Sequence, residues 1–310
     1  MRILITSVGT STSIGLIKGF RKFGDYIVGA DTNEYGYTAG SVLVDMYYRV
    51  SNASNELYME EIITIINEED VDLFIPINDI EVYVIAKNID KINCKCCIPS
   101  IETIEVVRDK YICNTVVEKM GVKVPCEISK DNINEKRILR DRIGVGSRGI
   151  VIIESGFSTP KYDREEVFLQ KYVEGTEYTV DILCDRQGNP IYIIPRKRIE
   201  VKSGVATKVE IENNEFLISE VKRILSEIKL PGFSNMQFIR DEADNYWFVE
   251  INYRFSGAGA TTLAVVNNYL LEFLNSFDET YAKASLNAGV KWNTVITRYY
   301  EEVVYEKGIS

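Results

Sequence analysis

The first hundred residues alternate between short apolar runs and segments in which hydrophobic positions recur at helical spacing. Apolar strands are expected at residues 2–8, 26–31 and 71–76, and helices at residues 14–23 and 57–67. Strands that alternate with helices in this way predict a parallel sheet covered by helices on both faces. We therefore expect a doubly wound, Rossmann-like α/β domain at the start of the chain.

Beyond this region the spacing of hydrophobic positions predicts a mixed α+β fold. A helix is expected at residues 107–124, where Gly121 and Pro125 end it. Short strands and turns dominate residues 138–198. The later expected elements are an amphipathic helix at 214–229, two strands at 235–240 and 246–255, a helix at about 263–275 and a strand at about 294–305.

The expected strand 246–255 carries polar side chains on one face. Because side chains alternate between the two faces of a strand, Glu250, Asn252 and Arg254 share a face. Carboxylate and amide oxygens suit Mg²⁺, and an arginine suits the phosphate oxygens that such a metal bridges. A hairpin register that places Gln237 opposite Glu250 would add a further oxygen ligand. The alternative is the solvated outer face of an antiparallel hairpin.

Two further segments have the composition of a nucleotide site. The loop Gly144–Gly149 offers unhindered backbone N–H groups and the Ser147 hydroxyl to phosphate, although it is not a Walker A loop. Residues 170–177 could present extended backbone to an adenine edge and an acid to the ribose. Taken alone, each segment is better explained as an ordinary turn between strands.

A basic stripe follows within the region of short strands. Arg196 and Arg198 share one face of an expected strand, and Lys202 comes shortly after it. In an acidic protein this stripe fits an anion site for a γ-phosphate or for a carboxylate substrate. We expect Arg198 to act in catalysis and Arg196 and Lys202 to bind substrate. The alternative is an edge strand that its charges protect from aggregation.

Composition excludes several classes of function. The chain has no His, which excludes Ser-His-Asp and Cys-His catalysis and His-ligated zinc. A net charge of -10 argues against nucleic acid and anionic lipid as partners. No apolar run is long enough to span a membrane, so a cytoplasmic location is expected. The cluster Cys94, Cys96 and Cys97 lacks the spacing of a zinc site and is expected to be buried thiols.

In order along the chain, these segments resemble the ATP-grasp superfamily, and most closely its carbamoyl-phosphate-synthase-like branch. The order is a Rossmann-like domain, Asp109-Lys110, Arg140 before the Gly144–Gly149 loop, residues 170–177, and Glu250-Ile251-Asn252-Tyr253-Arg254. Relatives often have Lys-Pro where this chain has Arg140-Asp141. The resemblance implies a pre-ATP-grasp domain over residues 1–105, a small lobe or lid over 106–170, and a C-terminal lobe with the metal site over 171–310.

The resemblance also implies a role for each site residue. Lys110 and Arg140 would contact the ATP phosphates, and Arg254 would stabilise the phosphoryl group in flight. The remaining implied contacts are Gly146 and Ser147 on the triphosphate, Gln170, Lys171 and Val173 on adenine, Glu177 on ribose, and Gln237, Glu250 and Asn252 on the metal. ATP and Mg²⁺ are the implied cofactors, with Mn²⁺ as a substitute metal.

The function that this resemblance implies is ATP-dependent carbon–nitrogen bond formation. ATP would phosphorylate a carboxylate to an acyl phosphate, which an amine then attacks. Two alternatives stay open: a carboxyphosphate- or carbamoyl-phosphate-type enzyme that uses bicarbonate, and a nucleotide-binding module without catalysis. The expected partners are small-molecule acid and amine substrates, and a homodimer is the default assembly for a soluble enzyme.

Overall fold

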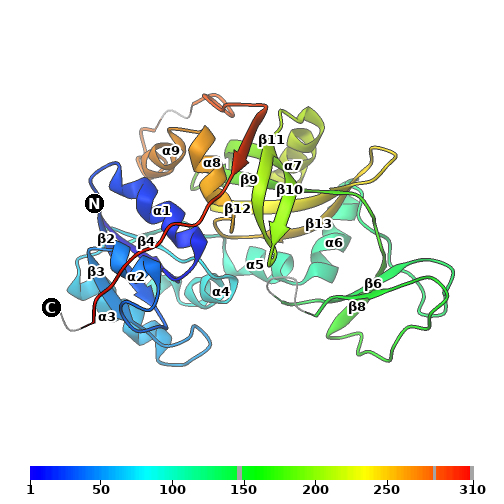
Figure 1. The fold of residues 1–310 in the computed structure, drawn as a ribbon, viewed down its shortest axis with the longest axis horizontal. Helices are drawn as coiled ribbons and strands as arrows, with labels where there is room; N and C mark the ends of the chain where they lie inside the picture. The colour runs from blue at the N-terminus through cyan, green and yellow to red at the C-terminus, as the bar shows by residue number, and fades with distance from the viewer. Residues whose placement is uncertain (145–148, 282–283, 308–310) are drawn as a thin grey trace.

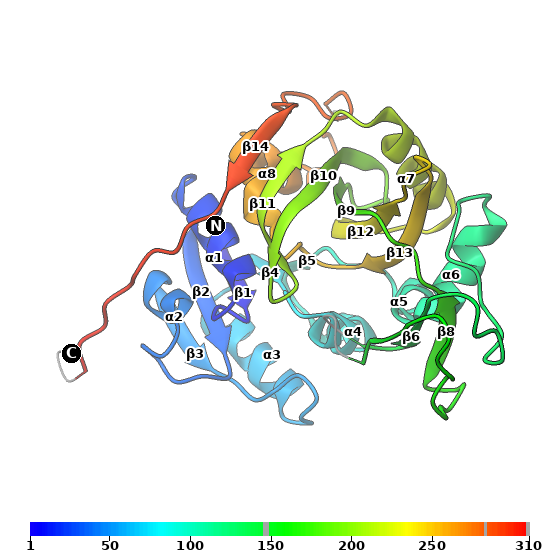
Figure 2. The ribbon, with the colours of Figure 1, turned by 45° about the vertical axis from the view of Figure 1, so that its right-hand side comes forward.

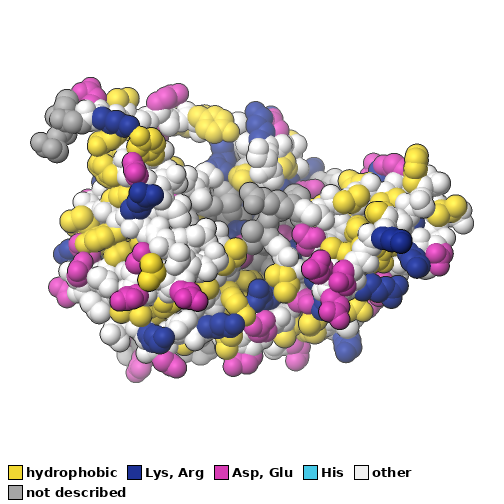
Figure 3. Space-filling view, turned by 90° about the horizontal axis from the view of Figure 1, so that it is seen from below, with side chains coloured by type: hydrophobic (Ala, Val, Ile, Leu, Met, Phe, Trp, Pro, Cys, Tyr) yellow, Lys and Arg dark blue, Asp and Glu magenta, His cyan; other side chains and the backbone are white. Residues whose placement is uncertain are grey.

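The computed structural model describes residues 1–144, 149–281 and 284–307. The chain forms three sheets, of five, three and six strands, in the order of the sequence. The three-stranded sheet projects from the rest of the molecule as a separate lobe (Figures 1 and 3). On the face that Figure 3 shows, acidic and basic side chains are interspersed.

The N-terminal sheet is parallel throughout, with the strand order β3-β2-β1-β4-β5. Apolar residues of α1, including Leu16 and Phe20, pack on one face, and those of α3, including Ile62 and Ile66, pack on the other. This arrangement confirms the expected doubly wound α/β domain. Its elements are β1 (Arg2–Thr6), α1 (Ser11–Arg21), β2 (Tyr26–Asp31), α2 (Ala39–Leu43), β3 (Met46–Arg49), α3 (Tyr58–Glu68), β4 (Leu73–Ile75), α4 (Asp79–Lys87), η1 (Ile89–Lys91) and β5 (Lys95–Cys96).

The remainder of the chain has the expected α+β character. Two helices, α5 (Ile101–Arg108) and α6 (Lys110–Lys119), lead into the three-stranded sheet of β6 (Arg137–Asp141), β7 (Val151–Ile153) and β8 (Val167–Lys171). The six-stranded sheet has the order β13-β12-β9-β10-β11-β14 and is antiparallel. Its elements are β9 (Thr176–Cys184), β10 (Pro190–Lys202), β11 (Val205–Ile211), α7 (Glu215–Glu227), β12 (Gly232–Arg240), β13 (Tyr246–Asn252), α8 (Gly259–Val265), α9 (Tyr269–Asn275) and β14 (Thr294–Thr297).

One hydrophobic core joins the N-terminal domain to the six-stranded sheet. It contains Ile5 of β1 and Leu16 of α1 together with Ile194 of β10 and Val209 of β11, all fully buried. Helices α1 and α8 lie side by side at this junction (Figures 1 and 2). The opposite face of the large sheet packs on α5, α6 and α7. This shared core fixes the N-terminal domain and the six-stranded sheet relative to each other.

Three expected elements differ from the structure. The helix predicted at 107–124 is two helices, α5 and α6, because Asp109 leaves the helical conformation and its carboxylate caps the N–H groups of Tyr111 and Ile112. The helix predicted at 263–275 is likewise two short helices, α8 and α9. Periodicity continues across both breaks, so hydrophobic spacing alone did not reveal them.

The strand predicted at 294–305 is also shorter than expected. Strand β14 ends at Thr297, the Arg298 N–H makes one more hydrogen bond to the Thr207 carbonyl of β11 at 2.8 Å, and the chain then runs extended along the N-terminal domain (Figure 2). Glu301 pairs there with Lys18, and the Tyr305 ring meets Tyr35 edge-to-face at 5.1 Å. Tertiary contacts with α1 and the β2–α2 loop, rather than a sheet, thus hold this segment.

The cysteine cluster consists of free thiols, as expected, but the three residues are partly rather than fully buried. Cys94, Cys96 and Cys97 form no disulfide, and burial raises the pKa of each thiol. Among the described residues, no group of Cys, Asp and Glu side chains gathers as a metal site, and no helix is long and apolar enough to cross a bilayer.

Glu81 of α4 is a fully buried carboxyl group and gives a prediction about pH. It accepts hydrogen bonds from Thr6 Oγ1 at 2.7 Å and from the Ile77 N–H at 2.9 Å, and burial raises its pKa. The unfolded carboxyl group therefore ionises first as the pH rises. We expect the free energy of unfolding, relative to a Glu81→Gln variant, to fall as the pH rises from the ordinary glutamate pKa toward the raised one.

Urea unfolding of both proteins at a series of pH values measures this difference. The glutamine keeps the size of the side chain and cannot ionise, so it isolates the titration of this group. A difference in unfolding free energy that stays constant with pH would contradict the assigned cause.

Candidate functional site

The β12–β13 hairpin places the three predicted metal ligands together. Gln237 lies directly opposite Glu250, and Asn235 lies opposite Asn252, so the predicted register is confirmed. Asn252 Nδ2 donates to Glu250 Oε1 at 3.2 Å and to Asn235 Oδ1 at 3.3 Å. The side-chain amide of Gln237 makes no hydrogen bond within the described part of the chain. The hairpin thus presents one carboxylate and three amide groups on one face.

This polar face is covered rather than solvated. Arg140, on β6 of the small sheet, reaches across to Glu250 with an Nη2–Oε2 distance of 3.2 Å. Its Nη1 also donates to the Val249 carbonyl at 3.4 Å. Burial lowers the pKa of Arg140, whereas the Glu250 charge acts to raise it. The small lobe therefore supplies a buried cation over the hairpin, which the solvated-hairpin alternative does not predict.

Lys110 brings a second cation to the same place. It is the first residue of α6, and its Nζ donates to the Gly144 carbonyl at 2.8 Å. Burial lowers the pKa of its ammonium group, and Glu250 partly offsets that effect. The predicted phosphate-loop residues Gly146 and Ser147 lie outside the described residues. Lys110 nevertheless joins the start of α6 to Gly144, the first residue of the Gly144–Gly149 loop.

Arg254 differs from its sequence interpretation. Strand β13 ends at Asn252, so Arg254 lies in the loop beyond it and not on the strand face that Glu250 and Asn252 share. Its Nε forms an ion pair with Asp79 Oδ2, at the start of α4, at 2.9 Å. The Tyr253 hydroxyl donates to the Asp79 carbonyl at 3.2 Å. The N-terminal domain thus fixes the arginine that follows the metal-ligand strand.

The predicted adenine segment follows β8 into β9. Gln170 is 3% exposed, its Nε2 donates to the Pro125 carbonyl at 2.9 Å, and its Oε1 is buried without a partner in the described chain. Lys171 pairs with Glu135 at 2.8 Å, and Val173 is half-buried. Glu177, the predicted ribose ligand, is exposed and pairs with Arg198 at 3.1 Å.

The basic stripe on β10 is divided between the interior and the surface. Arg196 is 1% exposed and forms a bidentate ion pair with Asp181, with Nε–Oδ2 and Nη2–Oδ1 distances of 2.7 and 2.8 Å. Arg198 donates to the Gly204 carbonyl at 2.9 Å, and burial lowers its pKa. Lys202 is exposed and pairs with Glu200. The substrate roles of these residues stay predictions.

The sequence analysis missed Asp79, Asp181 and Arg298. Asp79 and Asp181 neutralise Arg254 and Arg196, respectively, and Arg298 Nη1 donates to the Gly257 carbonyl at 3.2 Å. The three residues lie on three different elements, far apart in the sequence. No local motif marks them; the only available signal was that arginines expected to be buried require acidic partners.

The oxygen-bearing groups on the hairpin fit a divalent cation. Glu250 supplies a carboxylate, Asn252 and Gln237 supply amides, and none of them is fully buried. Mg²⁺ commonly takes one or two carboxylates and completes its shell with phosphate and water. A single Glu with two amides matches that preference, and it does not suit a structural zinc site, which uses sulfur and nitrogen ligands.

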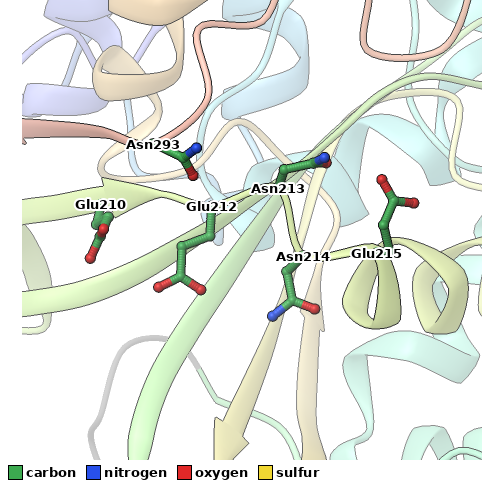
Figure 4. A pocket seen from close by; sticks show the side chains of 6 residues that line it. All are labelled: Glu210, Glu212, Asn213, Asn214, Glu215 and Asn293. Carbon is green, nitrogen blue, oxygen red and sulfur yellow. The ribbon is translucent and has the colours of Figure 1, made fainter.

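A polar hollow on the described surface lies elsewhere. It has a volume of about 560 Å³ and is lined by Glu210, Glu212, Asn213, Asn214, Glu215 and Asn293 (Figure 4). Three of these side chains are carboxylates and none is basic. A triphosphate would meet repulsion from these carboxylates, so this hollow does not suit a nucleotide phosphate.

Two family models match the chain. Residues 3–99 match the PylC-like N-terminal domain, and residues 163–296 match the family described as ATP-grasp in the biosynthetic pathway with Ter operon. The first match covers the parallel sheet. The second covers the six-stranded sheet as far as β14, together with β8.

Two curated proteins are similar to part of the chain. The 2-oxoglutarate carboxylase small subunit of Hydrogenobacter thermophilus is 28% identical over 190 residues, which cover 50% of this chain and 40% of that protein. The carbamoyl phosphate synthase large chain of Pyrococcus furiosus is 25% identical over 216 residues, covering 60% of this chain and 20% of that protein. The matches therefore span less than half the length of either relative.

Solved structures share the fold. The biotin carboxylase domain of H. thermophilus 2-oxoglutarate carboxylase, solved as a dimer with MgADP, ADP and bicarbonate, has a TM-score of 0.73 at 19% identity and covers 95% of this chain and 73% of that one. The L-amino acid ligase of Bacillus licheniformis has a TM-score of 0.68 at 12% identity, covering 88% and 73%.

Proposed function

We propose that this chain, which belongs to the ATP-grasp superfamily, is a Mg-ATP-dependent ligase that activates a carboxylate as an acyl phosphate and joins it to an amine. One observation carries the proposal: Arg140 of the small sheet reaches Glu250 of the Gln237–Asn252 hairpin at 3.2 Å, and the Glu250 charge also acts on the ammonium group of Lys110. A buried and a half-buried cation beside a carboxylate–amide set are the groups that a metal-bound triphosphate requires.

The proposed nucleotide lies between the small sheet and the hairpin. The unpartnered Oε1 of buried Gln170 fits a donor from the adenine ring, and Lys171 and Val173 would line the base through their backbone. Glu177, held by Arg198, would face the ribose. The proposed boundaries are residues 1–105 for the N-terminal domain, 106–170 for the lid and 171–310 for the lobe with the metal site, which Mn²⁺ could also occupy.

In the proposed first step a substrate carboxylate oxygen attacks the γ-phosphorus of ATP. The new P–O bond forms as the bond to the β–γ bridging oxygen breaks, and ADP leaves with the electron pair. Arg140 and Lys110 neutralise charge on the phosphates, and Arg254, oriented by Asp79, stabilises the group in transfer. Glu250, Asn252 and Gln237 would hold the metal, which would neutralise charge on the phosphates.

In the second step the amine nitrogen attacks the acyl carbon. The C–N bond forms, the C–O bond to phosphate breaks, and the amine proton passes to the departing phosphate or to water. No strong protein base is needed, which agrees with the absence of His. We propose Arg198 and Lys202 as the cations nearest the substrates on β10.

A second candidate function uses bicarbonate as the acid. The similarity to the 2-oxoglutarate carboxylase small subunit favours it, because the biotin carboxylase domain of 2-oxoglutarate carboxylase was solved with MgADP and bicarbonate. Carboxyphosphate would then replace the acyl phosphate as the activated species, with the same phosphate-binding groups.

An ADP-release screen against pairs of acids and amines, with bicarbonate as a separate acid, distinguishes these functions. Turnover that requires both an organic acid and an amine supports the ligase. Turnover with bicarbonate in place of the organic acid supports the second candidate. Tight ATP binding without turnover under any pair would instead identify a nucleotide-binding module and contradict both.

Replacing Lys110 with glutamine should weaken MgATP binding about tenfold, because a charge-assisted phosphate contact contributes roughly 1.5 kcal/mol. Calorimetric titration of the variant with MgATP measures the change. Lys119→Gln, at the opposite end of the same helix, is the matched control and should bind MgATP normally. Equal affinities for wild type and Lys110→Gln would show that Lys110 does not contact the phosphates.

A further inference from the structure

Three arginines that are distant or adjacent in the sequence contact three successive residues of one loop. Arg254 Nη1 donates to the Phe255 carbonyl at 3.1 Å, and Arg196 Nη2 donates to Ser256 Oγ at 3.0 Å. Arg298 Nη1 donates to the Gly257 carbonyl at 3.2 Å. Arg254 begins this loop beyond β13, whereas Arg196 comes from β10 and Arg298 from the chain beyond β14. Their cations therefore crowd around residues 255–257, which we name the arginine loop.

The carboxylates around the arginine loop balance only two of these charges. Asp79 pairs with Arg254 and Asp181 pairs with Arg196. Arg298 forms no ion pair within residues 1–144, 149–281 and 284–307. Burial and the neighbouring Arg196 charge lower its pKa. One positive charge at the loop thus lacks a counterion, in a place where water is partly excluded.

A second observation points to a ligand at the same loop. Arg196 is 1% exposed, and its Nη1 is buried without a hydrogen-bond partner in the described chain. A buried guanidinium N–H normally finds an acceptor, because leaving it unpaired is costly. On the side of the N-terminal domain, the Ser11 hydroxyl lies 3.5 Å from the Gly257 carbonyl. Hydrogen-bond donors from both domains therefore surround the loop. Together with the uncompensated positive charge of Arg298, they suit an anionic ligand.

We propose that the arginine loop, with Arg298 as its principal cation, binds a substrate carboxylate that does not react. One uncompensated charge matches a single carboxylate better than a phosphate, which carries nearly twice the charge. The reacting carboxylate must lie at the γ-phosphate, near Arg140 and Lys110, and so cannot supply this anion. The bound carboxylate belongs either to the acid, which is then a dicarboxylate, or to the amine, which is then an amino acid.

This inference rests on the proposed ligase but is tested by binding, without turnover. Full-length protein with MgADP is titrated with succinate, glutarate and adipate, each beside its monocarboxylate butyrate, valerate or caproate. A second arm compares alanine with ethylamine, which lacks the carboxylate. The melting-temperature shift and the dissociation constant are measured for wild type, Arg298→Gln, Arg298→Lys and the control Arg223→Gln, a surface residue of α7.

In one of the two series, we expect the compound with the additional carboxylate to bind more tightly than its matched partner. Arg298→Gln should raise the dissociation constant of that compound about tenfold to a hundredfold, because a charged hydrogen bond is lost. Arg298→Lys should restore part of the affinity. Arg223→Gln should behave as wild type. The first series identifies the acid as the source of the carboxylate, and the second identifies the amine.

Two results would overturn the inference. One is equal affinity for the paired compounds in both arms with wild type, and the other is equal discrimination by wild type and Arg298→Gln. MgADP affinity, measured in the same proteins, separates the two proposals. If the wild type does not bind MgADP, the proposed ligase function is contradicted. If it binds MgADP but does not discriminate between the paired compounds, only the arginine-loop site is contradicted.

Discussion

Replacing Glu250 with alanine or glutamine is expected to lower substrate-dependent ADP release about a hundredfold to a thousandfold. Glu250 is the only carboxylate of the proposed metal set, and it also lies 3.2 Å from Arg140. Its loss removes the charge that holds the metal and the partner that orients the arginine over the phosphates. Losses of this size are typical when one group that stabilises developing charge is removed.

The two substitutions should differ in stability but not in activity. Alanine leaves Arg140, which is 6% exposed, without its carboxylate, whereas glutamine retains an oxygen for the hydrogen bond. ADP release and urea unfolding are measured for both variants beside Glu227→Gln at the end of α7. Full activity in Glu250→Ala would show that the metal assignment is wrong. If activity falls only in the variant whose free energy of unfolding also falls, Glu250 has a structural role.

Asp181→Ala should reduce the free energy of unfolding by about 3–5 kcal/mol. Asp181 is 3% exposed and receives two hydrogen bonds from Arg196, at 2.7 and 2.8 Å, and a further one from Thr262. Removing it leaves a buried guanidinium without a counterion, which costs far more than the net contribution of an intact pair.

A double variant separates the buried charge from the packing. Asp181→Leu combined with Arg196→Met removes both charges and should recover most of the stability that Asp181→Ala loses. Denaturant unfolding of the single and double variants measures this coupling. A loss below about 1 kcal/mol in Asp181→Ala would mean that Arg196 is not held by this pair, which would favour its earlier interpretation as a substrate contact.

The sequence by itself determined the architecture and the centre of the site. Alternation of apolar strands and helices specified the parallel N-terminal sheet, because each element shows its own period. The two-residue period of β13 placed Glu250 and Asn252 on one face, and the short polar loop after β12 allowed the register that brings Gln237 opposite Glu250. These features depend on neighbours in the chain, so a local pattern is sufficient to predict them.

Only the tertiary structure decided which charges meet. Arg140 reaches Glu250 from 110 residues away, and Asp79 and Arg254 are 175 apart. The pairing of Arg196 with Asp181, and the arrival of Arg298 at the arginine loop, depend on how β9, β10 and the chain beyond β14 pack together. A sequence pattern gives the face of a strand but not what lies opposite it. Ion pairs between distant elements are therefore set by packing of the complete core.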